Sequence, residues 1–198
     1  MKRIITISRE FGSGGRTIGR EVAAKLGYSF FDRELVEEVA KRSGFSQEFI
    51  EENGEYANAR SSLLFYWATA KQHSMENLSM HDQIYIVQTK IIEELAEKGD
   101  CVIVGRCADY ILRERTDCLH AFICADMASR AKHIVEYYGE KDKSPEKRLA
   151  DKDQKRKVYY KNYTGRNWGE AKNYDICLNS GVLGLETCAE LIEQAARA

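Results

Sequence analysis

The hydrophobic positions of the chain alternate between short apolar runs and helical stripes. The runs predict five strands, which we place at residues 4–8, 28–31, 101–104, 119–124 and 174–178. Between them, apolar residues recur at helical spacing and indicate amphipathic helices. Strands separated by helices form βαβ units with right-handed crossovers. The pattern therefore predicts an α/β fold, a five-stranded parallel sheet covered by helices on both faces.

The same pattern predicts one domain over residues 1–198, a length typical of a single domain, with two helical excursions. The first excursion, residues 33–98, is mostly helical. The second, residues 140–170, contains a basic helix that begins at Ser144-Pro145-Glu146: a cap, a proline in first position and an acid in the first turn. We place the end of this helix near Tyr160.

Charge and cysteine usage narrow the class of protein. The chain has 30 basic and 31 acidic residues, so its net charge of −1 disfavours indiscriminate nucleic-acid binding. No apolar run approaches the ~18–20 residues of a membrane span. The six cysteines show no metal-ligand spacing, and Cys101, Cys124 and Cys177 lie in apolar runs where reduced cysteine acts as a small hydrophobe. We expect a cytoplasmic protein with no membrane partner; the pattern predicts no oligomeric state.

A glycine-rich loop joins the first predicted strand to the first helix and reads SREFGSGGRT from Ser8 to Thr17. In this context successive backbone N–H groups can hold phosphate at a helix N-terminus. Against the P-loop pattern G-x-x-x-x-G-K-[ST], Gly15 and Thr17 match, whereas Glu10 replaces the first glycine and Arg16 replaces the lysine.

The replacement of lysine by Arg16 has a chemical meaning. Arginine keeps the positive charge and can fork across two phosphate oxygens, but it is longer than lysine. The hydroxyl of Thr17 can hold Mg²⁺ near the phosphates. A glycine-rich turn without a ligand is the alternative, yet the order of strand, glycines, cation, hydroxyl and helix favours phosphate binding. The expected nucleotide-binding residues of the loop are Gly12, Ser13, Gly14, Gly15, Arg16 and Thr17.

Further charged residues follow the ends of predicted strands, where open α/β sheets bind ligands. Asp32 can orient an acceptor or a water on Mg²⁺, or only cap the next helix. Arg33 can reach an acceptor phosphate or lie on the surface. Arg106, after Gly105, suits an anion at a point where many P-loop enzymes place an acid. We expect Asp109 on a helix surface.

With the loop, Phe30-Phe31-Asp32-Arg33-Glu34, Val104-Gly105-Arg106 and the basic helix in place, the chain resembles the cytidylate kinase-like family. This is a branch of the nucleoside monophosphate kinases, and the resemblance covers nearly the whole chain. It implies Mg·ATP as the phosphoryl donor, a small acceptor that bears a phosphate or hydroxyl group, and a lid that closes on both. It also implies that Arg106 contacts the phosphate of the acceptor.

The lid candidate is residues 141–161, where nine basic and four acidic residues give a net charge of +5. Mobile arginines supply charge to a transferring phosphoryl group when a lid closes. Asp153-x-x-Arg156 resembles the family's lid pattern, so Arg156 is the first candidate for donor contact and catalysis, and Arg148 the second. Arg130 resembles a family position for acceptor binding. The alternative for this helix is a solvated charged face.

The aromatic residues of the following stretch are expected to pack the base of the lid onto the sheet; they are Tyr159, Tyr160, Tyr163, Trp168 and Tyr174.

These observations predict an ATP- and Mg²⁺-dependent kinase of a small molecule, most readily a nucleoside monophosphate, with Arg16, Asp32 and Arg156 in catalysis. A nucleotide-binding regulatory protein without turnover is the main alternative. The departures at Glu10 and Arg16, and the absent acid after the third strand, favour it. A nucleic-acid phosphotransferase is disfavoured by the net charge.

Overall fold

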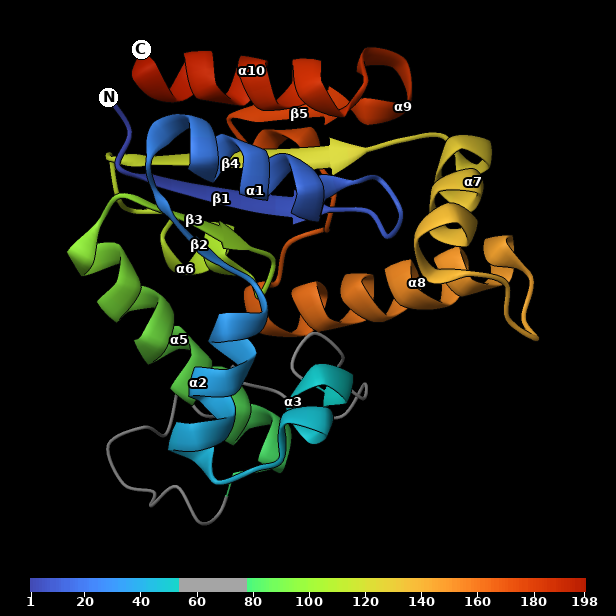
Figure 1. The fold of residues 1–198 in the computed structure, drawn as a ribbon. Helices are drawn as coiled ribbons and strands as arrows, with labels where there is room; N and C mark the ends of the chain where they lie inside the picture. Colours follow the sequence, from blue (N-terminus) through green and yellow to red (C-terminus); the bar gives the residue numbers. More distant parts are fainter. Residues whose placement is uncertain (54–77) are drawn as a thin grey trace.

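The computed structural model describes residues 1–53 and 78–198 and contains a five-stranded parallel sheet in the order β2-β3-β1-β4-β5 (Figure 1). Its strands are β1 (Ile4–Arg9), β2 (Ser29–Phe31), β3 (Cys101–Val104), β4 (Cys118–Cys124) and β5 (Ile176–Asn179). The predicted α/β class and the parallel sheet are confirmed. The strand bounds differ from the prediction by two residues at most.

The helices of the described chain alternate with these strands as the apolar stripes predict. They are α1 (Gly15–Leu26), α2 (Arg33–Ser43), α3 (Gln47–Asn53), α5 (Met80–Lys98), α6 (Ala108–Ile111), α7 (Met127–Tyr138), α8 (Pro145–Thr164), α9 (Ser180–Leu183) and α10 (Leu185–Arg197), with a 3₁₀ turn at Ala171–Asn173. The helical excursion predicted for residues 33–98 holds α2, α3 and α5, and its residues 54–77 lie outside the described chain.

Alternate strand residues form the two faces of the sheet. Ile4 and Ile103 point into a core shared with α2, α3 and α5, whereas Ile5, Ile7 and Val102 point into a core shared with α1 and α10. Figure 1 shows the sheet between these two groups of helices. Because β1, β3 and β4 are covered on both sides, these strands read as nearly continuous apolar runs.

Several helix ends follow the capping residues in the sequence. The side chains of Asp126 and Ser144 accept hydrogen bonds from the backbone N–H groups of the first turns of α7 and α8. The expected cap at Asp32 is absent, because that carboxylate faces Arg16 instead. Helix α8 continues past Tyr160 to Thr164 before Gly165 ends it in the left-handed conformation.

Helix α8 is fixed along its C-terminal half. Tyr159 and Tyr163 are buried there, and Tyr163 stacks on Tyr85 of α5 with ring centroids 4.1 Å apart. The predicted packing on the sheet is confirmed for Trp168 and Tyr174, which contact Phe122 of β4. For the tyrosines of α8 it is wrong in part, since Tyr159 and Tyr163 pack on Tyr85 of α5 and Tyr160 bonds to Asp109 of α6. A solvated charged face does not describe this half of α8.

The cysteines are all unpaired with one another, as expected for a reduced protein. Burial raises the pKa of the Cys101 thiol to about 11, which suits an unreactive core residue. Cys177 differs from its prediction: it is exposed because β5 is an edge strand. None of the helices in the described part of the chain is long and apolar enough to cross a membrane.

Candidate functional site

The loop between β1 and α1 turns sharply, and its glycines are required. Gly12 and Gly14 have φ values of +82° and +76°, in the left-handed region that favours glycine. A Cβ at Gly12 would lie 2.9 Å from Ile134 Cγ2, and one at Gly14 would clash with Leu185. Helix α1 then begins with no acid in its first turn, so its positive end is open to an anion.

Ser13 holds the loop on the sheet. Its side chain is buried, and its Oγ lies within hydrogen-bond distance of the carbonyl oxygens of Glu10 (2.9 Å) and Ile123 (3.1 Å). The hydroxyl of Ser180 donates to the carbonyl oxygen of Ser13 at 2.7 Å. We expected the Ser13 hydroxyl to bind nucleotide. In the structure it holds the loop against the sheet by hydrogen bonds to backbone carbonyl oxygens. Two of the three partners of Ser13, Ile123 and Ser180, lie more than a hundred residues away in sequence, which local spacing cannot reveal.

A cleft of about 170 Å³ lies over this loop, and we call it the donor cleft. Its lining is Arg9, Glu10, Phe11, Gly12, Gly14, Gly15, Arg16, Thr17, Asp32, His133, Tyr137, Tyr138 and Arg156. The sequence-predicted Arg16, Thr17 and Asp32 thus come together. Arg16 Nε and Asp32 Oδ2 form an ion pair at 2.7 Å, which is why Asp32 does not cap α2.

The donor cleft fits a magnesium-bound nucleoside triphosphate. The start of α1 offers its backbone N–H groups to phosphate, and the Thr17 hydroxyl and the Asp32 carboxylate are oxygen ligands of the kind Mg²⁺ takes. Among the described residues no group of three or more His, Cys, Asp and Glu gathers to hold a metal ion. A metal here would therefore depend on the phosphates for most of its ligands.

Aromatic residues of α7 form one wall of the donor cleft, and their place in the cleft was not predicted from the sequence. His133 stacks on Tyr137 with centroids 5.7 Å apart, and Phe11 stacks on Tyr138 at 5.9 Å. Tyr137 is 65% exposed. Flat exposed rings beside a phosphate-binding loop suit a nucleobase. The available signal was the one-turn spacing of His133 and Tyr137 on a helix that directly follows a strand.

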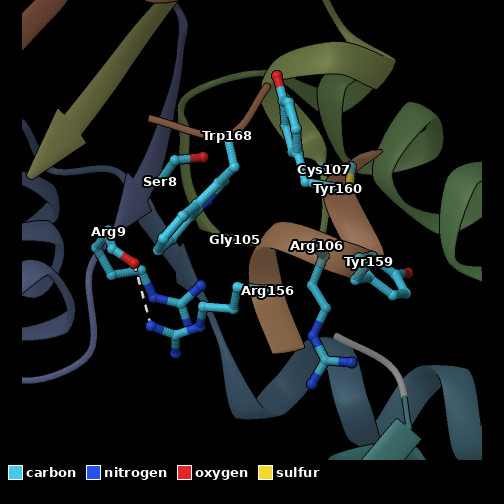
Figure 2. A pocket seen from close by; sticks show the side chains of 9 residues that line it. All are labelled: Ser8, Arg9, Gly105, Arg106, Cys107, Arg156, Tyr159, Tyr160 and Trp168. Carbon is cyan, nitrogen blue, oxygen red and sulfur yellow. Dashed lines mark hydrogen bonds between the residues drawn. The ribbon is translucent and has the colours of Figure 1, made fainter. Parts of the chain in front are cut away.

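A second, much smaller cavity of about 20 Å³ lies beside the carboxyl ends of β1 and β3, and we call it the arginine cavity (Figure 2). Its lining is Ser8, Arg9, Gly105, Arg106, Cys107, Arg156, Tyr159, Tyr160 and Trp168. Three of these residues are arginines, and none of the lining residues in the described chain is an aspartate or a glutamate. Such a lining suits an anionic ligand, since guanidinium groups bind phosphate or carboxylate oxygens in pairs.

The turn that carries Arg106 has an unusual backbone. Gly105, Arg106 and Cys107 have φ values of +74°, +59° and +55°. For the two residues with side chains this left-handed conformation costs roughly 1–2 kcal/mol each. Gln88 of α5 donates to the carbonyl oxygen of Arg106 at 3.1 Å and supports the turn. Backbone strain of this kind gathers at binding sites, where it aims a side chain.

Arg9 and Arg156 line both the donor cleft and the arginine cavity. Arg156 Nη1 donates to the carbonyl oxygen of Arg9 at 3.1 Å, the bond drawn in Figure 2. The structure thus brings the predicted Arg156 to the boundary between the two hollows. In Figure 2 the Arg106 side chain extends away from this pair.

Arg130, predicted to bind the acceptor, is placed elsewhere. Its side chain is 7% exposed and pairs with Asp153 at 2.5 Å and with Glu10 at 3.5 Å. Asp153 also accepts from the N–H of Phe11 at 2.8 Å, and Glu10 accepts from the N–H of Ala125 at 3.1 Å. This ionic triad of Glu10, Arg130 and Asp153 joins the loop to α7 and α8. It also explains why a carboxylate replaces the first glycine of the P-loop pattern.

Two other predicted arginines lie outside both hollows. Arg148 donates to the carbonyl oxygen of Gly139 at 3.0 Å, at the end of α7, two turns of helix before Arg156. Arg33 is exposed at the start of α2. Neither lines the donor cleft or the arginine cavity.

Asp109 is buried, which corrects the expectation of a helix-surface residue. It is 2% exposed and accepts hydrogen bonds from the hydroxyls of Ser8 (3.1 Å) and Tyr160 (2.6 Å). Burial raises the pKa of the Asp109 carboxyl, and the two hydroxyl bonds offset part of that rise. Its helix, α6, is short and packs against β1, so every side chain near its start points inward.

Comparison with known proteins identifies a family that the chain matches and solved structures that share its fold. No curated protein matches the chain significantly. An uncharacterized protein from Eubacterium ventriosum is 28% identical, with a TM-score of 0.74 over 98% of each chain. Shikimate kinases from Bacteroides thetaiotaomicron (15% identity, TM-score 0.59, 100% of both chains) and Acinetobacter baumannii (14%, 0.54, 98% of this chain and 93% of that one) share the fold alone. A model of the cytidylate kinase-like family matches residues 4–182.

Proposed function

Because the chain belongs to the cytidylate kinase-like family, we propose that it transfers the γ-phosphoryl group of ATP to a nucleoside monophosphate. The observation that carries this proposal is the sharing of Arg9 and Arg156 between the donor cleft and the arginine cavity. A kinase needs a triphosphate and an anionic acceptor to meet at one point, with cations at that point.

On the donor side, the N–H groups at the start of α1 bind phosphate and the α7 tyrosines stack on the nucleobase. When the nucleotide binds, Arg16 releases Asp32 and contacts the phosphates instead. A guanidinium group binds phosphate oxygens in the same paired geometry in which it binds a carboxylate. Thr17 and Asp32 would hold Mg²⁺, and the ion would supply positive charge to neutralise the phosphates. These residues orient the donor and stabilise charge.

On the acceptor side, Arg106 binds the anionic group of the acceptor from the strained turn. Trp168 and Tyr159 supply flat apolar walls. A phosphate oxygen that attacks ATP is already ionised, so this reaction asks for positioning more than for a strong base. That demand agrees with a cavity whose described lining is cationic and aromatic.

The test is ADP release from Mg·ATP across nucleoside monophosphates, with shikimate, sugars and pantetheine as rival acceptors. We expect CMP or another nucleoside monophosphate to stimulate release. Arg106→Ala should raise the acceptor KM by about 10–100-fold, the worth of a charged hydrogen bond. Arg113→Ala, an exposed arginine over the Tyr110 ring, is the matched control and should leave KM unchanged. Stimulation by another acceptor alone would keep the kinase and replace its substrate.

A second candidate is a nucleotide-binding regulatory protein without turnover. The 2.7 Å ion pair between Arg16 and Asp32 favours it, because two residues expected in transfer neutralise each other. Calorimetry separates the candidates. Binding of Mg·ATP together with no ADP release for any acceptor would support the regulatory protein and reject the kinase.

A further inference from the structure

We propose that Arg9, the last residue of β1, binds the transferring phosphoryl group and takes the part of the lysine that this phosphate loop lacks. No sequence motif marks Arg9, whereas Arg16 occupies the lysine position of the P-loop pattern. The inference rests on the proposed function, because it assumes that a phosphoryl group passes from the donor cleft to the arginine cavity.

The position of Arg9 is the first support. Of the described residues, only Arg9 and Arg156 line both hollows. A phosphoryl group that leaves a nucleotide in one hollow and reaches an acceptor in the other must cross this boundary. In transfer, negative charge spreads over the equatorial oxygens of that group, and a planar guanidinium can contact two of them at once.

The packing of the loop is the second support. A Cβ at Gly15 would lie 2.6 Å from Cβ and 2.9 Å from Cγ of Arg9. Gly15 does not have a positive φ, so glycine is needed here for space and not for backbone conformation. The last glycine of the loop therefore lets the stem of Arg9 lie directly over the start of α1, where phosphate binds.

The contrast with Arg16 is the third support. Arg16 lines the donor cleft only and pairs with Asp32 at 2.7 Å. Arg9 instead lies beside Arg156, whose Nη1 donates a hydrogen bond to the Arg9 carbonyl oxygen at 3.1 Å (Figure 2). This bond uses the backbone of Arg9, and it places the Arg156 guanidinium beside Arg9 at the boundary of the two hollows.

The experiment measures the binding of MgADP with and without aluminium fluoride, which mimics a phosphoryl group in transfer. In the wild-type protein aluminium fluoride should tighten MgADP binding by about 100-fold or more. Arg9→Ala should keep the Kd for MgADP within about 3-fold and lose most of that enhancement, whereas Arg9→Lys should keep a part of it. Arg197→Ala, on the exposed face of α10, is the control and should change neither value.

The outcomes separate this inference from the function it rests on. Wild-type protein that does not bind MgADP would reject the proposed function and this inference together. Normal enhancement in Arg9→Ala but loss in Arg16→Ala would overturn the inference alone and return the lysine's part to Arg16. Equal weakening of MgADP with and without aluminium fluoride in Arg9→Ala would overturn it too, since Arg9 would then be an ordinary donor ligand. Thermal unfolding of each variant verifies the fold, and Arg9→Lys decides if Arg9→Ala is unstable.

Discussion

Two of the carboxylates that are buried where α8 meets the rest of the molecule, Asp153 and Asp109, are held in opposite ways. Asp153 pairs with Arg130 and accepts from the N–H of Phe11, so the donor side of α8 is fastened by charge. Asp109 accepts from the hydroxyls of Ser8 and Tyr160, with no cation among the bonds that hold it in the described structure. The comparison shows that the partner of a buried carboxylate, a cation or a hydroxyl, determines its contribution to the stability of the fold more than burial itself does.

Breaking the ionic side should have the largest effect. Arg130→Ala leaves Asp153 buried without its cation and removes the partner of Glu10, so we expect a loss of about 3–5 kcal/mol in the free energy of unfolding. Urea denaturation at neutral pH measures this. Arg113→Ala should change the value by less than about 0.5 kcal/mol. An equally small loss in Arg130→Ala would show that the triad does not hold α8.

Breaking the hydroxyl side should cost less. Tyr160→Phe removes the 2.6 Å donor to Asp109 and leaves a buried acceptor with one hydroxyl partner, so we expect a loss of about 1–3 kcal/mol. The exposed Tyr137→Phe is the matched control and should be neutral within about 0.5 kcal/mol. A loss as large as that of Arg130→Ala would erase the contrast between the two sides.

The smallest effect should be a change in pH dependence. The pKa of Asp109 is raised on folding, so the folded protein keeps a proton that the unfolded chain releases. Stability from this group is therefore full below the ordinary carboxyl pKa and is lost as pH rises through the folded value. Asp109→Asn does not ionise, so its stability relative to wild type should rise with pH, starting from a difference within about 1 kcal/mol at low pH. Denaturation curves across pH measure this; a falling relative stability would contradict it.

The sheet and the loop could be predicted because their signals are local. Ile4, Ile5 and Ile7 form an apolar run whatever they face, and the glycines of the loop report a backbone that only glycine adopts easily. The ion pairs of Arg130 and the burial of Asp109 could not be predicted, for the opposite reason. Each is buried by partners distant in sequence, such as Glu10 for Arg130.

The candidate site shows the same division. Arg16, Thr17 and Asp32 meet because strand ends of a parallel sheet share one edge, which the strand order predicts. The ion pair that Asp32 makes in place of a helix cap depends on side-chain geometry across two elements. The exposed α7 tyrosines were missed because apolar periodicity describes what faces the core and says nothing of the opposite face.

The sharing of Arg156 between two hollows has a thermodynamic consequence. A ligand in either hollow that orders this side chain changes the free energy with which the other hollow binds its own ligand. Linkage requires the effect to be reciprocal: the factor by which donor alters acceptor affinity equals the factor by which acceptor alters donor affinity. Because α8 is anchored at Asp153 and at Tyr163, little backbone motion is available to absorb that coupling. We therefore expect cooperative binding of the two ligands to be carried by the shared arginine side chains, Arg156 together with Arg9.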